Sequence, residues 1–145
     1  MTIAVLLVED VKHLRGIVAD LLATLGDFKV VGEVATEAEA ILWLEEHPGG
    51  WDLAVIDLIL EQGTGMGVVA RCRQRPEGSK VVVFSDYATP GIQKHCIKLG
   101  ADAVFQKSHD VQDFIAWCSA LLPGPQAGPP AIAPPKSPAA GPPAR

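Results

Sequence analysis

The stretch at residues 52–57, Asp-Leu-Ala-Val-Ile-Asp, decides the fold, because four apolar residues stand there between two carboxylates. A short, uninterrupted apolar run is typical of a strand that is covered on both faces of its sheet. A bare carboxylate inside such a layer would be very costly, so we expect Asp57 just beyond the strand. The sequence therefore predicts a buried strand that ends at a cleft containing Asp57.

The rest of the chain alternates between apolar runs and helical patterns. Further strands are predicted at 3–8, 28–34, 80–84 and 103–106. Apolar residues at steps of three and four predict helices that open near residues 11, 36, 89 and 110, with a shorter one running to about residue 73 after a glycine-rich loop. Five strands alternating with helices indicate an α/β protein whose parallel sheet is covered on both faces.

Composition bounds the class of protein. With 145 residues, 48% hydrophobic and 20% charged, the chain fits one globular domain. A net charge of -5 without clustered Lys and Arg argues against direct nucleic-acid contact. No apolar stretch is long enough to span a bilayer, the first residues lack a signal peptide, and three scattered cysteines suggest reduced thiols. We expect a cytoplasmic protein without a membrane partner.

The composition changes abruptly at residue 123. Nine of the twelve prolines fall in residues 123–145, together with only two charged residues. Such a segment cannot bury a core. The sequence thus predicts a folded domain at residues 1–122 and a disordered, Pro/Ala-rich tail at 123–145.

Polar side chains follow four of the predicted strands at their carboxyl ends, where open α/β sheets bind ligands. Glu9 and Asp10 follow the first strand, Asp57 the third, Ser85 the fourth and Lys107 the fifth. Crowded carboxylates repel one another unless a cation is present, and oxygen ligands suit a hard divalent ion such as Mg²⁺. An ion beside a lysine and a hydroxyl predicts a site for a phosphoryl group.

This ordered set of residues resembles the receiver domain of two-component response regulators, of the single-domain, chemotaxis-regulator-like type. The resemblance covers roughly residues 3–122. It implies a flavodoxin-like fold, that is, a doubly wound five-stranded parallel sheet of order 2-1-3-4-5 with five helices. It also implies a phosphoryl group received from a sensor histidine kinase or a histidine phosphotransfer protein.

The resemblance assigns a role to each residue of the set. The implied roles are phosphoacceptor for Asp57, hydrogen-bond donor to the phosphoryl group for Ser85, ion pairing with that group for Lys107, and Mg²⁺ ligands for Glu9, Asp10, Asp57 and the backbone carbonyl of Ile59. Signalling would follow from movement of Ser85 toward the phosphoryl group. That movement would repack a face against a downstream protein. The face is formed by the helix that opens near residue 89, the strand at 103–106 and the helix that opens near residue 110.

Three positions depart from the family pattern. Val104 stands where the family usually has the aromatic residue of the switch, and the neighbouring Phe105 is predicted on the opposite sheet face. This argues against an aromatic-coupled switch. Ser108 stands where proline commonly follows the lysine, and Asp86 stands where a small residue follows Ser85. We expect Asp86 to bring a fourth carboxylate near the pocket and to slow phosphoryl transfer or hydrolysis.

Other function classes fit less well. A degenerate receiver that serves only as an interaction scaffold remains an alternative. An Asp-nucleophile phosphatase would want a second Asp where this chain has Ile59, and neither glycine-rich nucleotide-binding motif follows the first strand. We expect no enzymatic activity beyond the protein's own phosphotransfer and dephosphorylation, and a monomer or a phosphorylation-dependent dimer.

Overall fold

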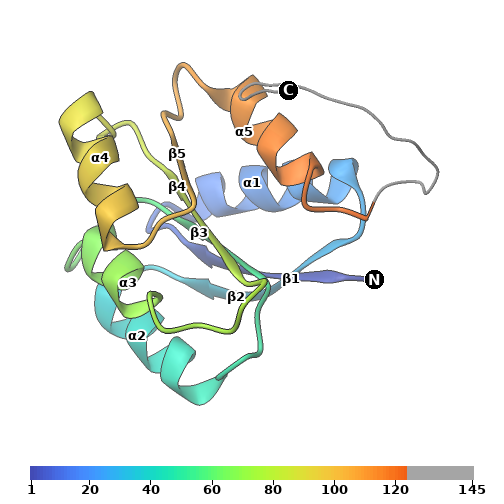
Figure 1. The fold of residues 1–145 in the computed structure, drawn as a ribbon, viewed down its shortest axis with the longest axis horizontal. Helices are drawn as coiled ribbons and strands as arrows, with labels where there is room; N and C mark the ends of the chain where they lie inside the picture. The colour runs from blue at the N-terminus through green and yellow to red at the C-terminus, as the bar shows by residue number, and fades with distance from the viewer. Residues whose placement is uncertain (124–145) are drawn as a thin grey trace.

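The computed structural model describes residues 1–123, in which strands and helices alternate along the chain (Figure 1). The strands are β1 (Ile3–Val8), β2 (Phe28–Val34), β3 (Leu53–Ile56), β4 (Lys80–Phe84) and β5 (Ala103–Phe105). The helices are α1 (Lys12–Leu25), α2 (Glu37–Glu46), α3 (Gly65–Arg71), α4 (Pro90–Leu99) and α5 (Val111–Ser119). The strands pair in parallel in the order β2-β1-β3-β4-β5, which confirms the predicted doubly wound, flavodoxin-like fold.

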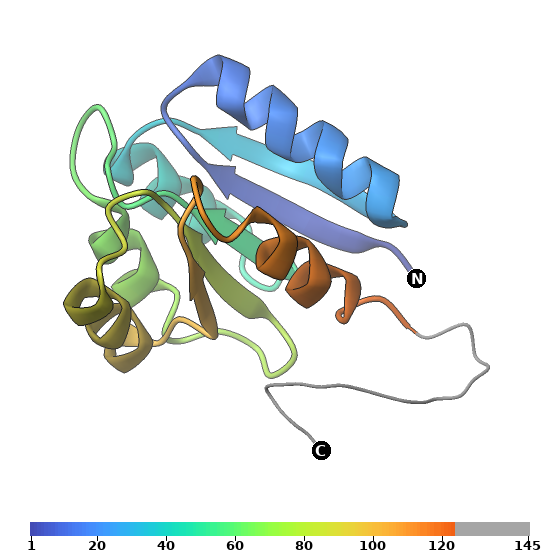
Figure 2. The ribbon, with the colours of Figure 1, turned by 90° about the horizontal axis from the view of Figure 1, so that it is seen from above.

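The sheet lies between two helical layers. Figures 1 and 2 show α1 and α5 on one face and α2, α3 and α4 on the other. Side chains of β3 pack against both helical layers. Leu53 and Val55 pack on the α1 and α5 side, whereas Ala54 and Ile56 pack on the other side. All four residues are buried, as their apolar run predicts.

The two edge strands differ from the centre. Half-buried and exposed residues alternate along β2 up to the buried Val34. The strand order confirms its predicted place near the edge of the sheet. Strand β5 is one residue shorter than predicted. The reason is that the Gln106 N–H donates to the Asp110 carboxylate at 2.9 Å and leaves the strand pairing.

Helix ends follow the predicted capping chemistry in part. Thr36 caps α2 by accepting from the Glu39 N–H at 3.1 Å, but the Glu39 carboxylate accepts from Ala35 rather than from Thr36. Asp110 occupies the N-cap position of α5 without a side-chain bond to the helix, because its carboxylate is bonded to Gln106. Helix α3 ends at Arg71, two residues before the predicted end.

The amino-terminal edge of the sheet is held together by Arg75. Its guanidinium donates to the carbonyls of Cys72, Ser79 and Gly100 and pairs with Asp102 at 2.9 Å. This places a multiply bonded cation at the end of the sheet opposite Asp57.

The carboxyl-terminal helix is anchored at that same edge. After α5 the chain packs Leu122 against Gly26, where an added Cβ would lie 2.6 Å from Leu122 Cδ1. The predicted tail lies outside the described residues, except for Pro123.

The three cysteines lie in the interior of the domain. Cys72, Cys96 and Cys118 are unpaired and buried. Burial raises the pKa of Cys72 and of Cys118 to about 12. Among residues 1–123, no helix combines the length and the apolar character that crossing a membrane requires.

Candidate functional site

The site begins where β1 and β3 end side by side. Val8 lies opposite Ile56 in the parallel register, and the Asp57 N–H donates to the Val8 carbonyl at 2.9 Å. Glu9, Asp10 and Asp57 therefore emerge at one edge of the sheet. One carboxylate oxygen from each residue lies within 4.8 Å of those of the other two. The structure thus brings together the three predicted metal ligands that act through side chains.

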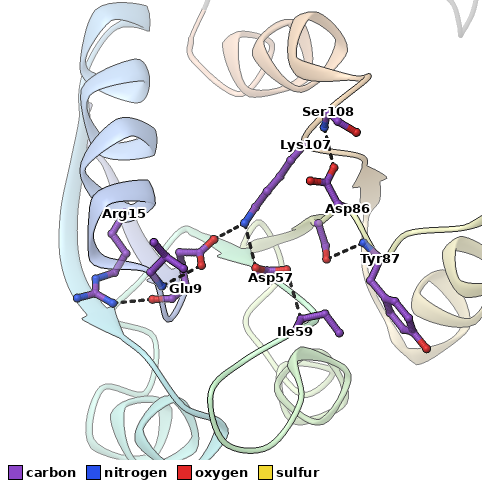
Figure 3. Close-up of polar contacts among 10 residues, drawn as sticks. Glu9, Arg15, Asp57, Ile59, Asp86, Tyr87, Lys107 and Ser108 are labelled. Atoms are coloured by element: carbon purple, nitrogen blue, oxygen red, sulfur yellow. Dashed lines mark hydrogen bonds and ion pairs between the residues drawn. The ribbon is translucent and has the colours of Figure 1, made fainter.

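The Lys107 side chain extends toward this cluster from the loop that follows β5 (Figure 3). Its Nζ donates to Asp57 Oδ2 at 2.9 Å and to Glu9 Oε1. Burial opposes the charge on this ammonium, but the hydrogen bonds to Glu9 and Asp57 outweigh it and raise the pKa of Lys107 above 10.5. One cation therefore offsets part of the negative charge of the cluster.

Glu9 is the most constrained of the carboxylates. The residue is 6% exposed, and its Oε2 accepts from the Val11 N–H at 3.1 Å. Arg15 donates to the Glu9 carbonyl at 2.6 Å and fixes the backbone. Burial raises the pKa of Glu9 above its ordinary value of 4.5, although the contact with Lys107 opposes the rise. A further cation beside Glu9 would therefore stabilise the charged form of its carboxylate.

Asp10 is not used as a helix cap. Val11 is the N-cap of α1, no side chain bonds to that end of the helix as a cap, and the Val11 N–H is taken by Glu9. The Asp10 carboxylate instead belongs to the acidic cluster. Its position therefore fits ion binding better than capping.

The loop from β3 to α3 holds Asp57 by its backbone. The Ile59 N–H donates to Asp57 Oδ1 at 3.3 Å, and Ile59 pairs with Thr64 in an antiparallel bridge. At Gly65 an added Cβ would lie 2.0 Å from the Asp57 carbonyl oxygen, a backbone contact that no side-chain movement relieves. The loop can therefore pass behind Asp57 only because residue 65 is glycine.

Glu37 secures the same loop and was not predicted from the sequence. Its carboxylate accepts from the Thr64 N–H at 2.8 Å, and its N–H donates to the Gln62 carbonyl. A Cβ at Gly63 or Gly67 would lie 2.4 or 2.1 Å from Glu37 side-chain atoms. The sequence signal was the run of alternate glycines, which indicates that something packs closely against the loop, although not what.

Ser85 and its neighbours form the third side of the site. Ser85 is fully buried, and its Oγ accepts from the Tyr87 N–H at 3.2 Å. Asp86 Oδ1 accepts from the Ser108 N–H at 2.7 Å, so this carboxylate lies outside the acidic cluster (Figure 3). A fourth carboxylate thus lies near the site, as expected, but it bonds the residue after Lys107 and does not join the three clustered carboxylates. Its slowing of phosphoryl transfer or hydrolysis stays a prediction. The ring of Tyr87 points away from Asp57 in Figure 3.

The two residues at the switch position lie as the strand periodicity predicts. Val104 packs against the core beneath α4, and it lines a groove of about 570 Å³ with Pro90 and Ile97. Phe105 lies on the opposite face, where its ring stacks edge-on against Phe114. No aromatic side chain thus stands at residue 104 to follow Ser85.

Taken together, the site presents oxygen ligands, a fixed cation and a buried hydroxyl at one edge of the sheet. Three carboxylates on separate, rigid backbone segments suit a hard divalent cation. The Lys107 ammonium and the Ser85 hydroxyl suit the oxygens of a phosphoryl group.

The sequence is similar to those of known regulatory proteins. The photosynthetic apparatus regulatory protein RegA of Rhodovulum sulfidophilum is 38% identical over 85 residues, which are 59% of this chain and 43% of RegA. The chain spans about half the length of the curated relatives it matches.

Solved structures show the same fold. A DNA-binding response regulator of the LuxR family from Staphylococcus aureus superposes with a TM-score of 0.70 at 20% identity, covering 82% of this chain and 98% of that one. A response regulator from Burkholderia pseudomallei, solved with a phosphorylated aspartic acid, calcium ion and citrate, superposes with a TM-score of 0.66 at 23% identity, covering 78% of this chain and 64% of that one.

The family itself is shown by the sequence. Residues 5–118 match the family described as response regulator receiver domain, and this match extends from β1 into α5. The chain belongs to the response regulator receiver domain family.

Proposed function

We propose that this receiver domain accepts a phosphoryl group on Asp57 from the phosphohistidine of a sensor histidine kinase or a histidine phosphotransfer protein. The observation that carries the proposal is the Lys107 ammonium held against Asp57 at 2.9 Å, beside a cluster of three carboxylates. The other ends of the strands carry no comparable cluster among residues 1–123.

The chemistry follows from the positions of these side chains. An Asp57 carboxylate oxygen attacks the phosphorus, the bond from phosphorus to the partner's imidazole nitrogen breaks, and the imidazole leaves as a neutral ring once it is protonated. Lys107 offsets the charge on the transferred oxygens. The Ser85 Oγ accepts a hydrogen bond from Tyr87, so its own proton is available to the phosphoryl group.

The acidic cluster supports a requirement for a divalent cation, which we propose is Mg²⁺. Glu9, Asp10 and Asp57, with the backbone carbonyl of Ile59, would hold it. The cation would neutralise charge on the carboxylates and on the phosphoryl oxygens. The Burkholderia pseudomallei neighbour, solved with a phosphorylated aspartic acid and a calcium ion, supports this proposal.

Output is proposed to pass through protein contacts at the face of α4, β5 and α5, with phosphorylation shifting its conformation and, where it favours self-association, forming a dimer. We also propose a cytoplasmic location and no enzymatic activity beyond self-directed phosphotransfer and dephosphorylation. The net charge of -5 supports a domain that does not itself contact nucleic acid, although the Staphylococcus aureus neighbour is a DNA-binding response regulator.

The direct test is incubation with acetyl phosphate and Mg²⁺, followed by intact mass measurement. We expect one added phosphoryl group that hydroxylamine removes, as it does from an acyl phosphate, and none in Asp57→Asn. Asp52→Asn is the matched control, because Asp52 flanks the same strand at its other end and bonds the Ala4 N–H. Uptake by Asp57→Asn would assign the phosphoryl group elsewhere.

Val104 supports one alternative, a receiver that acts as an interaction scaffold without phosphorylation. Beryllofluoride with Mg²⁺ mimics the phosphorylated aspartate and separates the two functions. Failure of the wild-type protein to bind this mimic, with partner binding unchanged in Asp57→Asn, would favour the scaffold.

A further inference from the structure

Two loops at the edge of the site are joined by side-chain hydrogen bonds. One loop follows β4 at residues 85–89 and the other follows β5 at residues 106–110. Asp86 Oδ1 accepts from the Ser108 N–H at 2.7 Å (Figure 3), and Gln106 Nε2 donates to the Ala88 carbonyl at 2.7 Å. We call these four residues the loop latch.

The loop latch brackets the two residues that approach Asp57 from this side. Ser85 directly precedes Asp86, and Lys107 lies between Gln106 and Ser108. The backbone adds a third tie, since the Ser85 N–H donates to the Phe105 carbonyl at 3.0 Å. The loop that carries Ser85 and the loop that carries Lys107 are thus bonded to each other on both sides of these two residues.

The Gln106 half of the loop latch is built into the structure rather than lying on its surface. Ala88 is fully buried, and its carbonyl accepts from both Gln106 and Gln93. The Gln106 backbone is in turn held by Asp110. Only the Asp86 half lies at the exposed rim, where it restrains the residue directly after Lys107.

The Asp86 half depends on two residues that both depart from the family pattern. A small residue at 86 would provide no acceptor, and proline at 108 would provide no N–H. Asp86 and Ser108 are therefore the acceptor and the donor of one bond, and each is of use only with the other.

We propose that Asp86 is a positioning residue. It fixes the backbone next to Lys107, so that the Lys107 ammonium stays directed at Asp57. It also makes the loop that carries Ser85 and the loop that carries Lys107 move together. The inference rests on the proposed phosphoryl transfer to Asp57. Side chains that must meet the reacting group within a fraction of an ångström gain rate from such restraint, since small misplacements cost up to about a hundredfold. The loop latch couples the two loops through polar contacts, in a chain without an aromatic residue at 104.

The test compares rates of phosphoryl uptake from acetyl phosphate with Mg²⁺ in wild type and five variants, the fifth being the double variant of Asp86→Ala with Ser108→Pro. Asp86→Ala removes the acceptor, Asp86→Asn keeps a carbonyl oxygen without the charge, and Ser108→Pro removes the donor. Ser108→Ala is the matched control, because it keeps the N–H. We expect about tenfold slower uptake in Asp86→Ala and in Ser108→Pro, no further loss in the double variant, and near wild-type rates in Asp86→Asn and Ser108→Ala.

A purely electrostatic role for Asp86 predicts a different pattern. Removing a repelling charge would speed uptake equally in Asp86→Ala and Asp86→Asn and leave Ser108→Pro unchanged, and that result would overturn the proposal. Loss of folding is separated by measuring urea unfolding of every variant, and by the rescue in Asp86→Asn, which general destabilisation would not produce.

Amide hydrogen exchange tests the loop latch without any phosphoryl chemistry. In the unphosphorylated protein we expect exchange at Ser108 to be at least about tenfold faster in Asp86→Ala than in wild type and in Asp86→Asn. If wild type takes up no phosphoryl group, the proposed function fails while this measurement still decides the latch. Equal exchange in all three proteins would show that Asp86 holds nothing in place.

Discussion

At the scale of single residues, Lys107 occupies carboxylates that the proposed divalent cation would also use. The ammonium bonds Glu9 and Asp57, which are two of the three side chains that would hold the ion. We predict that Lys107→Ala tightens Mg²⁺ binding by about three- to tenfold, because a positive charge leaves the site, while phosphoryl uptake falls.

Titration calorimetry with Mg²⁺ measures this change. Lys98→Ala, at the end of α4, serves as the control for loss of one positive charge. Weaker Mg²⁺ binding in Lys107→Ala would mean that the lysine organises the carboxylates rather than competing with the ion.

The raised pKa of Glu9 makes the free energy of unfolding depend on pH. Because burial raises its pKa above 4.5, the folded protein binds this proton more tightly than the unfolded chain does. The free energy of unfolding contributed by Glu9 therefore decreases as pH rises from about 4.5 through the raised pKa.

We predict that Glu9→Gln removes this contribution. In urea unfolding with EDTA, the difference in the free energy of unfolding between Glu9→Gln and wild type should grow with pH over that interval, and saturating Mg²⁺ should reduce it by stabilising the wild-type carboxylate. Glu46→Gln, at the exposed end of α2, is the control. A difference that does not change with pH would contradict the prediction.

At the scale of elements, the loop from β3 to α3 depends on close backbone approach. We predict that Gly65→Ala costs roughly 2–4 kcal/mol and lowers phosphoryl uptake, because its Cβ would meet the Asp57 carbonyl at 2.0 Å. Gly16→Ala, in α1, should instead stabilise by about 0.5–1 kcal/mol, since its Cβ meets nothing within 4 Å. Thermal and urea unfolding of the two variants measure this contrast, and similar effects of both would argue against the close approach.

The same loops mark how far sequence reasoning reaches. The apolar runs predicted the strands. The polar residues that follow these runs were predicted to meet at one edge, because parallel strands all finish there; they are Glu9, Asp10, Asp57, Ser85 and Lys107. Strand periodicity likewise predicted that Val104 and Phe105 face opposite layers.

Contacts between loops were outside that reach. Asp86 was expected near the pocket, but its bond to Ser108 was not predicted, and neither Gln106 nor Glu37 was singled out. Spacing along the chain shows which residues share an edge, but a loop side chain has several donors within reach. Only the three-dimensional path of both loops decides which donor it meets.

At the scale of the whole molecule, the buried cysteines report on global unfolding. Cys72, Cys96 and Cys118 lie in the two cores, and burial raises the pKa of each thiol, so thiolate is scarce at pH 8. We predict that the native protein resists an aromatic disulfide reagent at pH 8, whereas three thiols react at once in urea. Spectrophotometric counting of released thiolate checks this. Rapid reaction of one thiol in the native protein would reveal local opening of its helix.

The packing of Leu122 on Gly26 fixes the distance between the end of the α5 segment and Asp57. Figure 2 shows the end of α5 near the start of β1. Asp57 directly follows β3 and so lies at the opposite, carboxyl ends of the strands. A six-residue strand such as β1 is roughly 20 Å long. The chain therefore continues after Pro123 from a point about one strand length from Asp57. In the proposed function, a phosphoryl group on Asp57 would have to act on that point across the length of the sheet.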